Sequence, residues 1–305
     1  MSARRTGRTG VVDVGGTSMR RSVVEIDAAG QPVVGEVVSE RSATDPSTAV
    51  AQVLDLAEAA SRDVDAVGVV LPGVVDEARG TGVWSENLGW RDVPFGDLLR
   101  ARLAVPVEVG HDVRAWGAAE RRWGAARGLS DVAVVVVGTG IAAALVVDGR
   151  SVVARGLAGE IGHLRVADDE PCACGGTGCL EAVASAAGIV RAYNAVAERP
   201  VTGAVEVADG VRRRDPRAVE VWETALDRLA DGLAALTTVV APEAIVLGGG
   251  LSRAGEDLLL EPLRGRLATR LTYTPVPDLR ATAFAGTGGL IGAACLAAPS
   301  REESS

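Results

Sequence analysis

Apolar residues occur along the chain in two kinds of segment. Short aliphatic runs end at glycine, proline or aspartate, which is the pattern of buried strands. Longer segments rich in alanine and leucine have apolar residues at helical spacing. The short runs predict strands at 10–14, 23–26, 33–38, 66–71, 106–109, 132–137, 141–148, 244–247 and 279–283. The longer segments predict helices at 46–62, 95–103, 115–126, 182–197, 217–240, 254–270 and 288–296.

The order of these elements predicts an α/β protein whose layout is duplicated. A hairpin opens the chain around residues 15–17, and a second hairpin follows around residues 138–140. Both turns contain a Gly-Thr pair, and strands and helices alternate after each hairpin. Because 305 residues exceed one typical domain, we expect two domains with sizeable cores.

The composition excludes several classes of protein. The net charge is −9, whereas a nucleic-acid-binding protein needs a basic face, so we expect no nucleic-acid partner. The apolar runs are too short to cross a bilayer, and no apolar signal segment follows Met1. We therefore expect no membrane contact and a cytoplasmic location. All 31 basic residues are arginine, which excludes a lysine-containing Walker phosphate loop and Schiff-base chemistry.

Three of the four cysteines and one of the two histidines lie close together in one segment. Three thiolates and one imidazole form the ligand set of a closed, tetrahedral structural zinc site. The alternatives are three buried free cysteines beside a core histidine, or a disulfide, which an oxidising compartment would favour. We expect a structural Zn²⁺ ion here. Its predicted ligands are His163, Cys172, Cys174 and Cys179.

Two carboxylates bracket the predicted zinc site. Glu160 precedes His163 by three residues, and Glu181 follows Cys179 by two. An ion that fixes this segment would also fix both carboxylates, which accept hydrogen bonds from the hydroxyls of a polyol. The alternative is that both glutamates are solvated loop charges.

Further candidates follow the ends of predicted strands. Asp112 comes after the strand at 106–109 and opens a helix, where α/β folds place reacting groups. The alternative is a plain helix N-cap, a role that aspartate also fills. At the first hairpin tip, backbone N–H groups can approach a phosphate, and Asp13 is placed to hold a hydrated Mg²⁺.

The order of motifs resembles the ROK (repressor, open reading frame, kinase) family, especially its glucokinase-like sugar kinases, over nearly the whole chain. The segments 160–163 and 172–181 are similar to the family's zinc and sugar signature, which is the most specific of the motifs. Three further segments resemble its first phosphate loop, its second phosphate loop and its adenosine-side loop. Their residues are Asp13, Gly15, Gly16 and Thr17; Gly138, Thr139 and Gly140; and Gly248, Gly249 and Gly250.

This resemblance implies an actin-like ATPase (ribonuclease H-like) fold of two lobes, with ATP and sugar in the cleft between them. The implied lobes are residues 1–112, onto which a helix at 286–305 packs back, and residues 113–285 with the zinc site. The implied reaction is ATP-dependent phosphorylation of a hexose, glucose or a related sugar, at the 6-hydroxyl, with Asp112 as general base. The implied assembly is a homodimer or homotetramer. The implied sugar-binding residues are Asn87, His111, Glu160, His163 and Glu181.

Three features of the sequence depart from the family pattern. His111 stands where the kinases usually have asparagine, either as a partner of a sugar hydroxyl or as a core residue. A lightly perturbed histidine would titrate between about pH 6 and 7.5. The residues 142–144 are alanines where glycines are usual, and alanine costs about 1–2 kcal/mol at a positive φ. Ser18 replaces a common lysine.

Two other functions compete with the kinase. The family's transcriptional repressors carry an N-terminal helix-turn-helix domain, and residues 1–9 are too few for one. The other alternative is a sugar-binding regulator with weak or no kinase activity, because of the alanines at 142–144.

Overall fold

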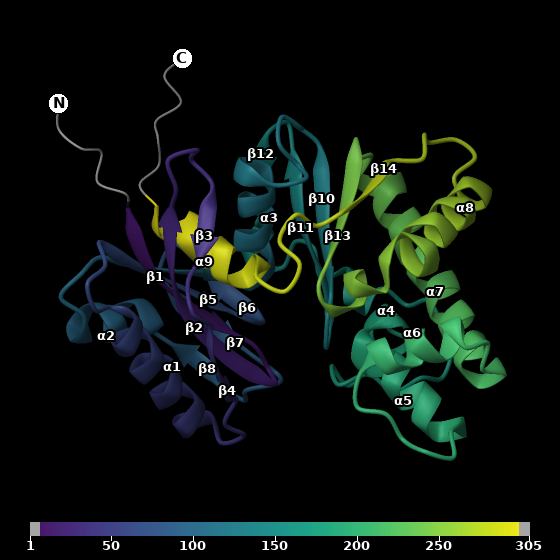
Figure 1. The fold of residues 1–305 in the computed structure, drawn as a ribbon, viewed down its shortest axis with the longest axis horizontal. Coiled ribbons are helices and arrows are strands. Elements are labelled where there is room, and N and C mark those ends of the chain that lie inside the picture. The colour runs from purple at the N-terminus through teal and green to yellow at the C-terminus, as the bar shows by residue number, and fades with distance from the viewer. Residues whose placement is uncertain (1–6, 299–305) are drawn as a thin grey trace. The chain divides into compact units, whose positions relative to one another are not determined.

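A computed structural model describes residues 7–298, which form two compact units (Figure 1). The first unit contains the chain up to Ala119 and the segment from Thr287 onward; the second is Glu120–Gly286. The predicted lobe boundaries at residues 112 and 285 stay a prediction, and residues 299–305 of the predicted final helix lie outside the described residues. Within 7–298, no helix has the length and apolar character needed to cross a bilayer.

The first unit contains a mixed sheet, a separate small sheet and four helices among the described residues. The strands are β1 (Arg8–Val14), β2 (Ser18–Ile26), β3 (Pro32–Val34), β4 (Val38–Arg41), β5 (Ala66–Leu71), β6 (Val74–Asp76), β7 (Thr81–Trp84), β8 (Arg91–Val93) and β9 (Val107–His111). The helices are α1 (Pro46–Ala60), α2 (Phe95–Arg102), α3 (Asp112–Trp123), whose last turn belongs to the second unit, and α9 (Gly288–Ala297). The main sheet has the order β3-β2-β1-β5-β9, with β4 also on β2, and the small sheet is β6-β7-β8.

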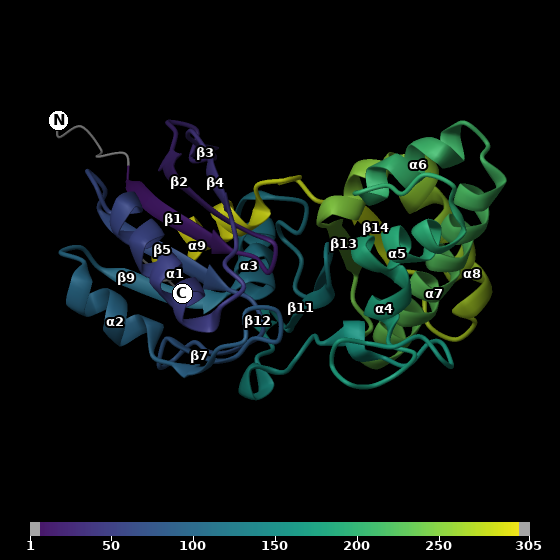
Figure 2. The same ribbon diagram turned by 90° about the horizontal axis from the view of Figure 1, so that it is seen from below.

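Alternation along the strands gives the main sheet two buried faces. Successive strand residues point to opposite sides. Val12 and Val14 pack in one core with α1 and α2, whereas Val11 packs in another with α9. Helices α1 and α9 therefore cover opposite faces of this sheet (Figure 2). The backbone of α9 comes so close to β5 at Gly68 that a side chain there would meet the carbonyl group of Ala293.

The second unit repeats the layout of the first main sheet. Its strands are β10 (Val132–Val137), β11 (Ile141–Val147), β12 (Arg150–Ser151), β13 (Ala244–Gly248) and β14 (Asp278–Ala281). Its helical segments are η1 (Ala154–Gly156), η2 (Ile161–His163), α4 (Leu180–Ala184), α5 (Ala186–Val196), α6 (Ala204–Arg212), α7 (Pro216–Val240), η3 (Gly250–Ala254), η4 (Glu256–Leu260) and α8 (Glu261–Arg270). The order β12-β11-β10-β13-β14 again joins an antiparallel hairpin to two parallel strands. The predicted duplication is confirmed.

Helix α7 supplies much of the core of the second unit. It begins after Asp215, whose carboxylate accepts the N–H of Arg217, and Pro216 takes the first helical position. Its apolar residues recur every three or four positions, so they form one stripe toward the sheet. The fully or almost fully buried members of this stripe are Trp222, Leu226, Leu229, Leu233 and Leu236.

Several predicted boundaries were wrong, for local reasons. The strand predicted at 33–38 is two short strands, because β3 and β4 each pair with a different part of β2. The helix predicted at 182–197 is broken at Ser185, whose hydroxyl caps α5 by accepting the N–H of Gly188. The helix predicted at 254–270 begins only at Glu261 in its α-helical form, after Gly255 with φ 87°. The small sheet and α6 were not predicted.

Candidate active site and metal centre

The first predicted phosphate loop is the tight turn between β1 and β2. The N–H of Gly15 donates to the carbonyl of Ser18 over 3.0 Å, which closes the turn. Asp13 lies directly opposite Arg20 in the strand register, and the two side chains form an ion pair. The Asp13 side chain is only 13% exposed and packs against Gly289 in the first turn of α9, where a side chain would collide with it.

The carboxyl ends of β1, β5 and β9 bring further candidates to the same edge, because these strands are parallel. Asn87 lies beside the phosphate loop: its Cβ is 2.8 Å from where a side chain on Gly16 would begin. Asp112 follows β9 as the first residue of α3, with 28% of its side chain exposed. Its Oδ1 accepts the N–H of the next residue, Val113, over 2.7 Å. An N-cap side chain satisfies later N–H groups of the first turn, so the capping alternative stays a prediction.

His111 is buried and held by neighbours. Its Nδ1 accepts the N–H of Arg114 over 3.3 Å and lies 3.4 Å from Oδ1 of Asp112, so the ring proton belongs on Nε2. The carboxylate of Glu77 holds His111 and Arg114 in place, because it accepts the backbone N–H of His111 and the Nε–H of Arg114. Burial, and secondarily the charge of Arg114, lowers the pKa of His111 to about 3. The predicted titration between pH 6 and 7.5 was therefore wrong, whereas its contact with sugar stays a prediction.

The two other predicted nucleotide loops lie together at one edge of the second unit. The turn Gly138-Thr139-Gly140 joins β10 to β11, and Gly248–Gly250 begins with the last residue of β13, which is parallel to β10. Gly249 packs against the carbonyl group of Val137, immediately before the first of these loops. Among the described residues, the non-glycine positions with positive φ do not include Ala142–Ala144, which lie in β11. These alanines therefore carry no left-handed penalty.

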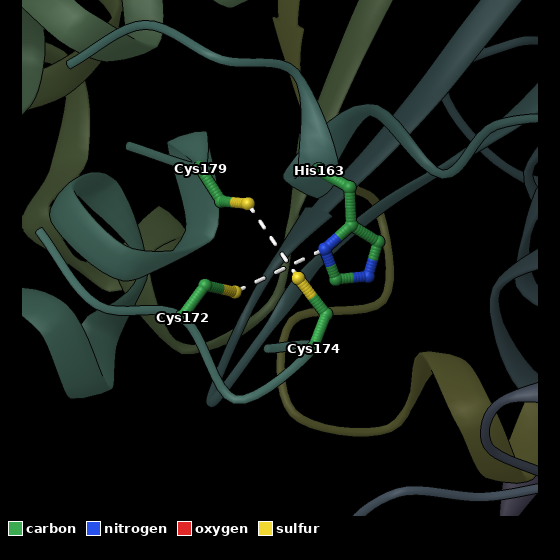
Figure 3. Close-up of side chains that lie close together, drawn as sticks. All are labelled: His163, Cys172, Cys174 and Cys179. Atoms are coloured by element: carbon green, nitrogen blue, oxygen red, sulfur yellow. Dashed lines mark hydrogen bonds between the residues drawn. The ribbon is translucent and has the colours of Figure 1, made fainter. Parts of the chain in front are cut away.

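The structure brings the four predicted zinc ligands together. One ligand atom from each lies within 4.8 Å of all the others, and the side chains converge in Figure 3. A tetrahedral ion with Zn–S distances of about 2.3 Å separates neighbouring ligand atoms by about 3.8 Å. The Sγ atoms of Cys174 and Cys179 are 3.7 Å apart, and Sγ of Cys172 lies 4.0 Å from Nδ1 of His163. The donor set and its spacing fit zinc.

The local chain geometry explains this convergence. The N–H of Cys172 donates to the carbonyl of Gly176, and Gly178, with φ 74°, lies too close to the carbonyl of Ala167 for any side chain. Burial, together with the two neighbouring sulfurs, raises the pKa of Cys179 to about 12. A bound cation would reverse this effect, since it stabilises thiolates.

The two carboxylates that bracket the cysteines, Glu160 and Glu181, lie in different surroundings. Glu160 is half-buried and immediately precedes η2, which ends at His163. Glu181, in the first turn of α4, uses Oε2 to accept the N–H of Ile141 over 2.9 Å. Glu181 is therefore not a solvated loop charge, because it connects the cysteine segment to the turn after β10.

The sequence analysis did not predict three features near the candidate site residues: Arg20, Glu77 and a small pocket. Arg20 could have been found by counting outward from the first hairpin turn, which places it opposite Asp13. Glu77 lies after β6, a strand for which the sequence carried no clear pattern. A small pocket beside the third loop involves α6, also missed. Residues lining it include Ala204, Ala208, Arg212, Trp222, Gly250 and Leu251.

Comparison with known proteins gives one consistent likeness. The family model described as ROK family matches residues 9–300. A glucokinase of Streptomyces coelicolor is 31% identical over an alignment covering 95% of this chain and 98% of its own. The crystal structure of a ROK family glucokinase from Streptomyces griseus, in complex with glucose and AMPPNP, has a TM-score of 0.85 and 31% identity, covering 95% of this chain and 99% of that chain.

A regulator matches as well. The DNA-binding transcriptional dual regulator NagC of Escherichia coli is 30% identical over 76% of this chain and 60% of its own length. The structural likeness shows that the chain has the actin-like ATPase fold.

Proposed function

Because the chain belongs to the ROK family, we propose that it is an ATP-dependent sugar kinase that phosphorylates a hexose, glucose or a related sugar, at the 6-hydroxyl. Glucokinases that are about as long as this chain and align along nearly all of it support a sugar kinase in general. The observation that carries the reaction is the placement of Asp112, partly exposed, at the same sheet edge as the first phosphate loop.

In this proposal Asp112 takes the proton of the sugar 6-hydroxyl as the hydroxyl oxygen attacks the γ-phosphorus of ATP, and ADP leaves with the bridging oxygen. Phosphoryl transfer needs mainly positioning and charge stabilisation, so one well-placed base suffices. The hydrogen bond from Val113 fixes Oδ1, which orients the carboxylate. Asn87 binds a further hydroxyl beside the first phosphate loop, and His111 offers its Nε2–H.

The second unit would hold the nucleotide and the other sugar hydroxyls. Backbone N–H groups of the loops at 138–140 and 248–250 suit phosphate oxygens, and the loop at 248–250 is the one that would lie on the adenosine side. Glu160 and Glu181 accept hydrogen bonds from hydroxyls. His163 has two ring nitrogens: Nδ1 faces Cys172 at the proposed zinc site, so Nε2 is the one that would reach the sugar.

Two metal ions belong to the proposal. Zn²⁺, held by His163 and the three cysteines, would be structural, because four protein ligands leave no open position. Asp13 is the residue that would hold hydrated Mg²⁺, which neutralises phosphate charge when bound. The Asp13 carboxylate supplies oxygen ligands at the glycine turn, and Mg²⁺ would share this carboxylate with the guanidinium of Arg20.

The alternative function is a sugar-binding regulator with weak or no kinase activity, which the likeness to NagC favours. The strand geometry of Ala142–Ala144 removes one reason for preferring it. Assembly into a homodimer or homotetramer, which the family resemblance implies, and a cytoplasmic location, which we expected from the apolar pattern of the chain, stay predictions. Light scattering after size-exclusion chromatography would test the assembly.

A coupled assay of ADP release against a panel of hexoses and amino sugars tests the proposed function. The wild-type protein should turn over at least one sugar with MgATP. Asp112→Asn is the matched control: it should lose about 10²–10⁴-fold in kcat while calorimetry still detects sugar binding. Binding of a sugar without turnover by the wild type would favour the regulator, and full activity of Asp112→Asn would exclude Asp112 as the base.

A further inference from the structure

The turn Gly138–Ile141 is held on both sides by one short segment of chain, residues 181–186. On one side, Oε2 of Glu181 accepts the N–H of Ile141 over 2.9 Å. On the other, the N–H of Ala186 donates to the carbonyl of Gly138 over 2.9 Å. The turn has an internal bond as well, from the N–H of Gly138 to the carbonyl of Gly140. The position of the turn therefore depends on where this segment lies.

The carboxylate of Glu181 packs directly on the turn. A side chain on Gly140 would overlap Oε2 of Glu181, so the two groups are in close contact. Gly162 lies on the other side of Glu181, where a side chain would meet the Glu181 Cβ and the carbonyl of Ile141. Glu181 is thus enclosed between the turn and the segment that carries Glu160 and His163.

The segment 181–186 is itself anchored in the core. Leu180 is fully buried and packs against Gly232 of α7. Ser185 is 1% exposed, and its hydroxyl caps α5 by accepting the N–H of Gly188. Cys179, one of the predicted zinc ligands, immediately precedes α4 (Figure 3). A carboxylate on such a segment provides a fixed acceptor.

We propose that Glu181 is a positioning residue for the second phosphate loop, and that it contributes to nucleotide affinity independently of any contact with sugar. One carboxylate oxygen accepts the N–H of Ile141, which keeps the N–H groups of Thr139 and Gly140 directed at phosphate, while the N–H of Gly138 closes the turn. The other oxygen remains for a sugar hydroxyl. This inference rests on the proposed function for its account of nucleotide binding, whereas the hold on the loop is a property of the second unit alone.

Two substitutions separate the roles. Glu181→Gln keeps an oxygen that can accept from Ile141 but removes the charge that favours sugar, whereas Glu181→Ala removes both. Glu170→Ala is the control, since it deletes a carboxylate near the predicted zinc ligands that forms an ion pair with the half-exposed Arg191 and, among the described residues, no hydrogen bond with the turn at 138–141. Each variant is first checked for zinc content and thermal unfolding like those of the wild type. If Glu181→Ala fails this check, Glu181→Gln against Glu181→Leu gives the same comparison.

Hydrogen exchange of the Ile141 amide and calorimetric titration with AMPPNP, without sugar, are then measured. We expect Glu181→Ala to speed the exchange and to weaken AMPPNP binding, each by about tenfold or more, because the amide loses its acceptor. Glu181→Gln and Glu170→Ala should stay within about twofold of the wild type in both. Titration with glucose should show weaker binding for Glu181→Gln.

Wild-type exchange and AMPPNP affinity in Glu181→Ala would overturn the proposal and leave the proposed function standing. If the wild type binds no AMPPNP, the proposed function fails instead, and the exchange rate of Ile141 alone decides whether Glu181 holds the loop. Equal loss in Glu181→Gln and Glu181→Ala would also overturn the proposal, since charge and not the acceptor would then matter.

Discussion

Replacing His111 by asparagine should flatten the pH dependence of stability below neutral pH. In the native protein the His111 side chain is 4% exposed, and its Nδ1 already accepts the N–H of Arg114. A proton on Nδ1 would break that hydrogen bond and add charge to a buried group beside a guanidinium. Burial first, and the charge of Arg114 second, therefore lower the pKa of His111 from 6.5 to about 3.

The direction and size of this change in the free energy of unfolding follow from the linkage between proton binding and folding. Below pH 6.5 the unfolded chain binds a proton at His111 while the native state does not, so acid favours unfolding. The loss begins near pH 6.5 and grows until the pH reaches about 3. At about pH 5 the gap is about 1.5 pH units, and at 1.36 kcal/mol per unit the free energy of unfolding falls by about 2 kcal/mol. At about pH 7.5 the contribution is close to zero.

Urea unfolding of wild type and His111→Asn at about pH 7.5 and 5 tests this reasoning. Comparing the two proteins cancels the effects of acid on the zinc ligands, which both share. The wild type should lose about 2 kcal/mol more than the variant on acidification. The chain has two histidines, so proton NMR can follow each ring, and the resonance absent from His111→Asn should not titrate above about pH 5. Equal acid losses, or titration of that resonance near pH 6.5, would refute the burial argument.

Two other changes test the metal centre and the core of the second unit. The protein should bind one equivalent of zinc, and Cys174→Ser should lose the metal and unfold at a lower temperature. The control variant Cys295→Ser should keep the metal. Metal analysis and thermal unfolding test this prediction, and an active, well-folded, zinc-free protein would contradict it. Glu120 is 0% exposed and accepts from the N–H groups of Ala125 and Ala283 and the hydroxyl of Thr282. Glu120→Ala should cost about 3–5 kcal/mol in urea unfolding, and a loss below about 1 kcal/mol would show that water replaces the carboxylate.

The sequence predicted best where local chemistry was sufficient. The cysteine segment was recognisable because its ligand types and glycines are adjacent in the chain, and the hairpins because alternation is broken by a glycine turn. Contacts that depend on tertiary structure were not predictable. Nothing local shows that Glu181 accepts from Ile141, or that burial holds His111 neutral. Ser185 fits a helical pattern, and only its contact with Gly188 shows that it begins a new helix.

The duplicated scaffold places its carboxylates in two different ways. In the first unit the carboxylate, Asp13, belongs to the hairpin and the glycine against it, Gly289, belongs to a helix. In the second unit the glycine, Gly140, belongs to the hairpin and the carboxylate, Glu181, to a helix. Both contacts lie at a turn where backbone N–H groups suit phosphate, and both require that the glycine has no Cβ. A methyl group at either glycine would collide with the carboxylate packed against it. The two similar hairpins therefore differ in the position of the charge. The first hairpin carries the carboxylate itself, as Asp13, whereas the second carries only the glycine that contacts the carboxylate of Glu181.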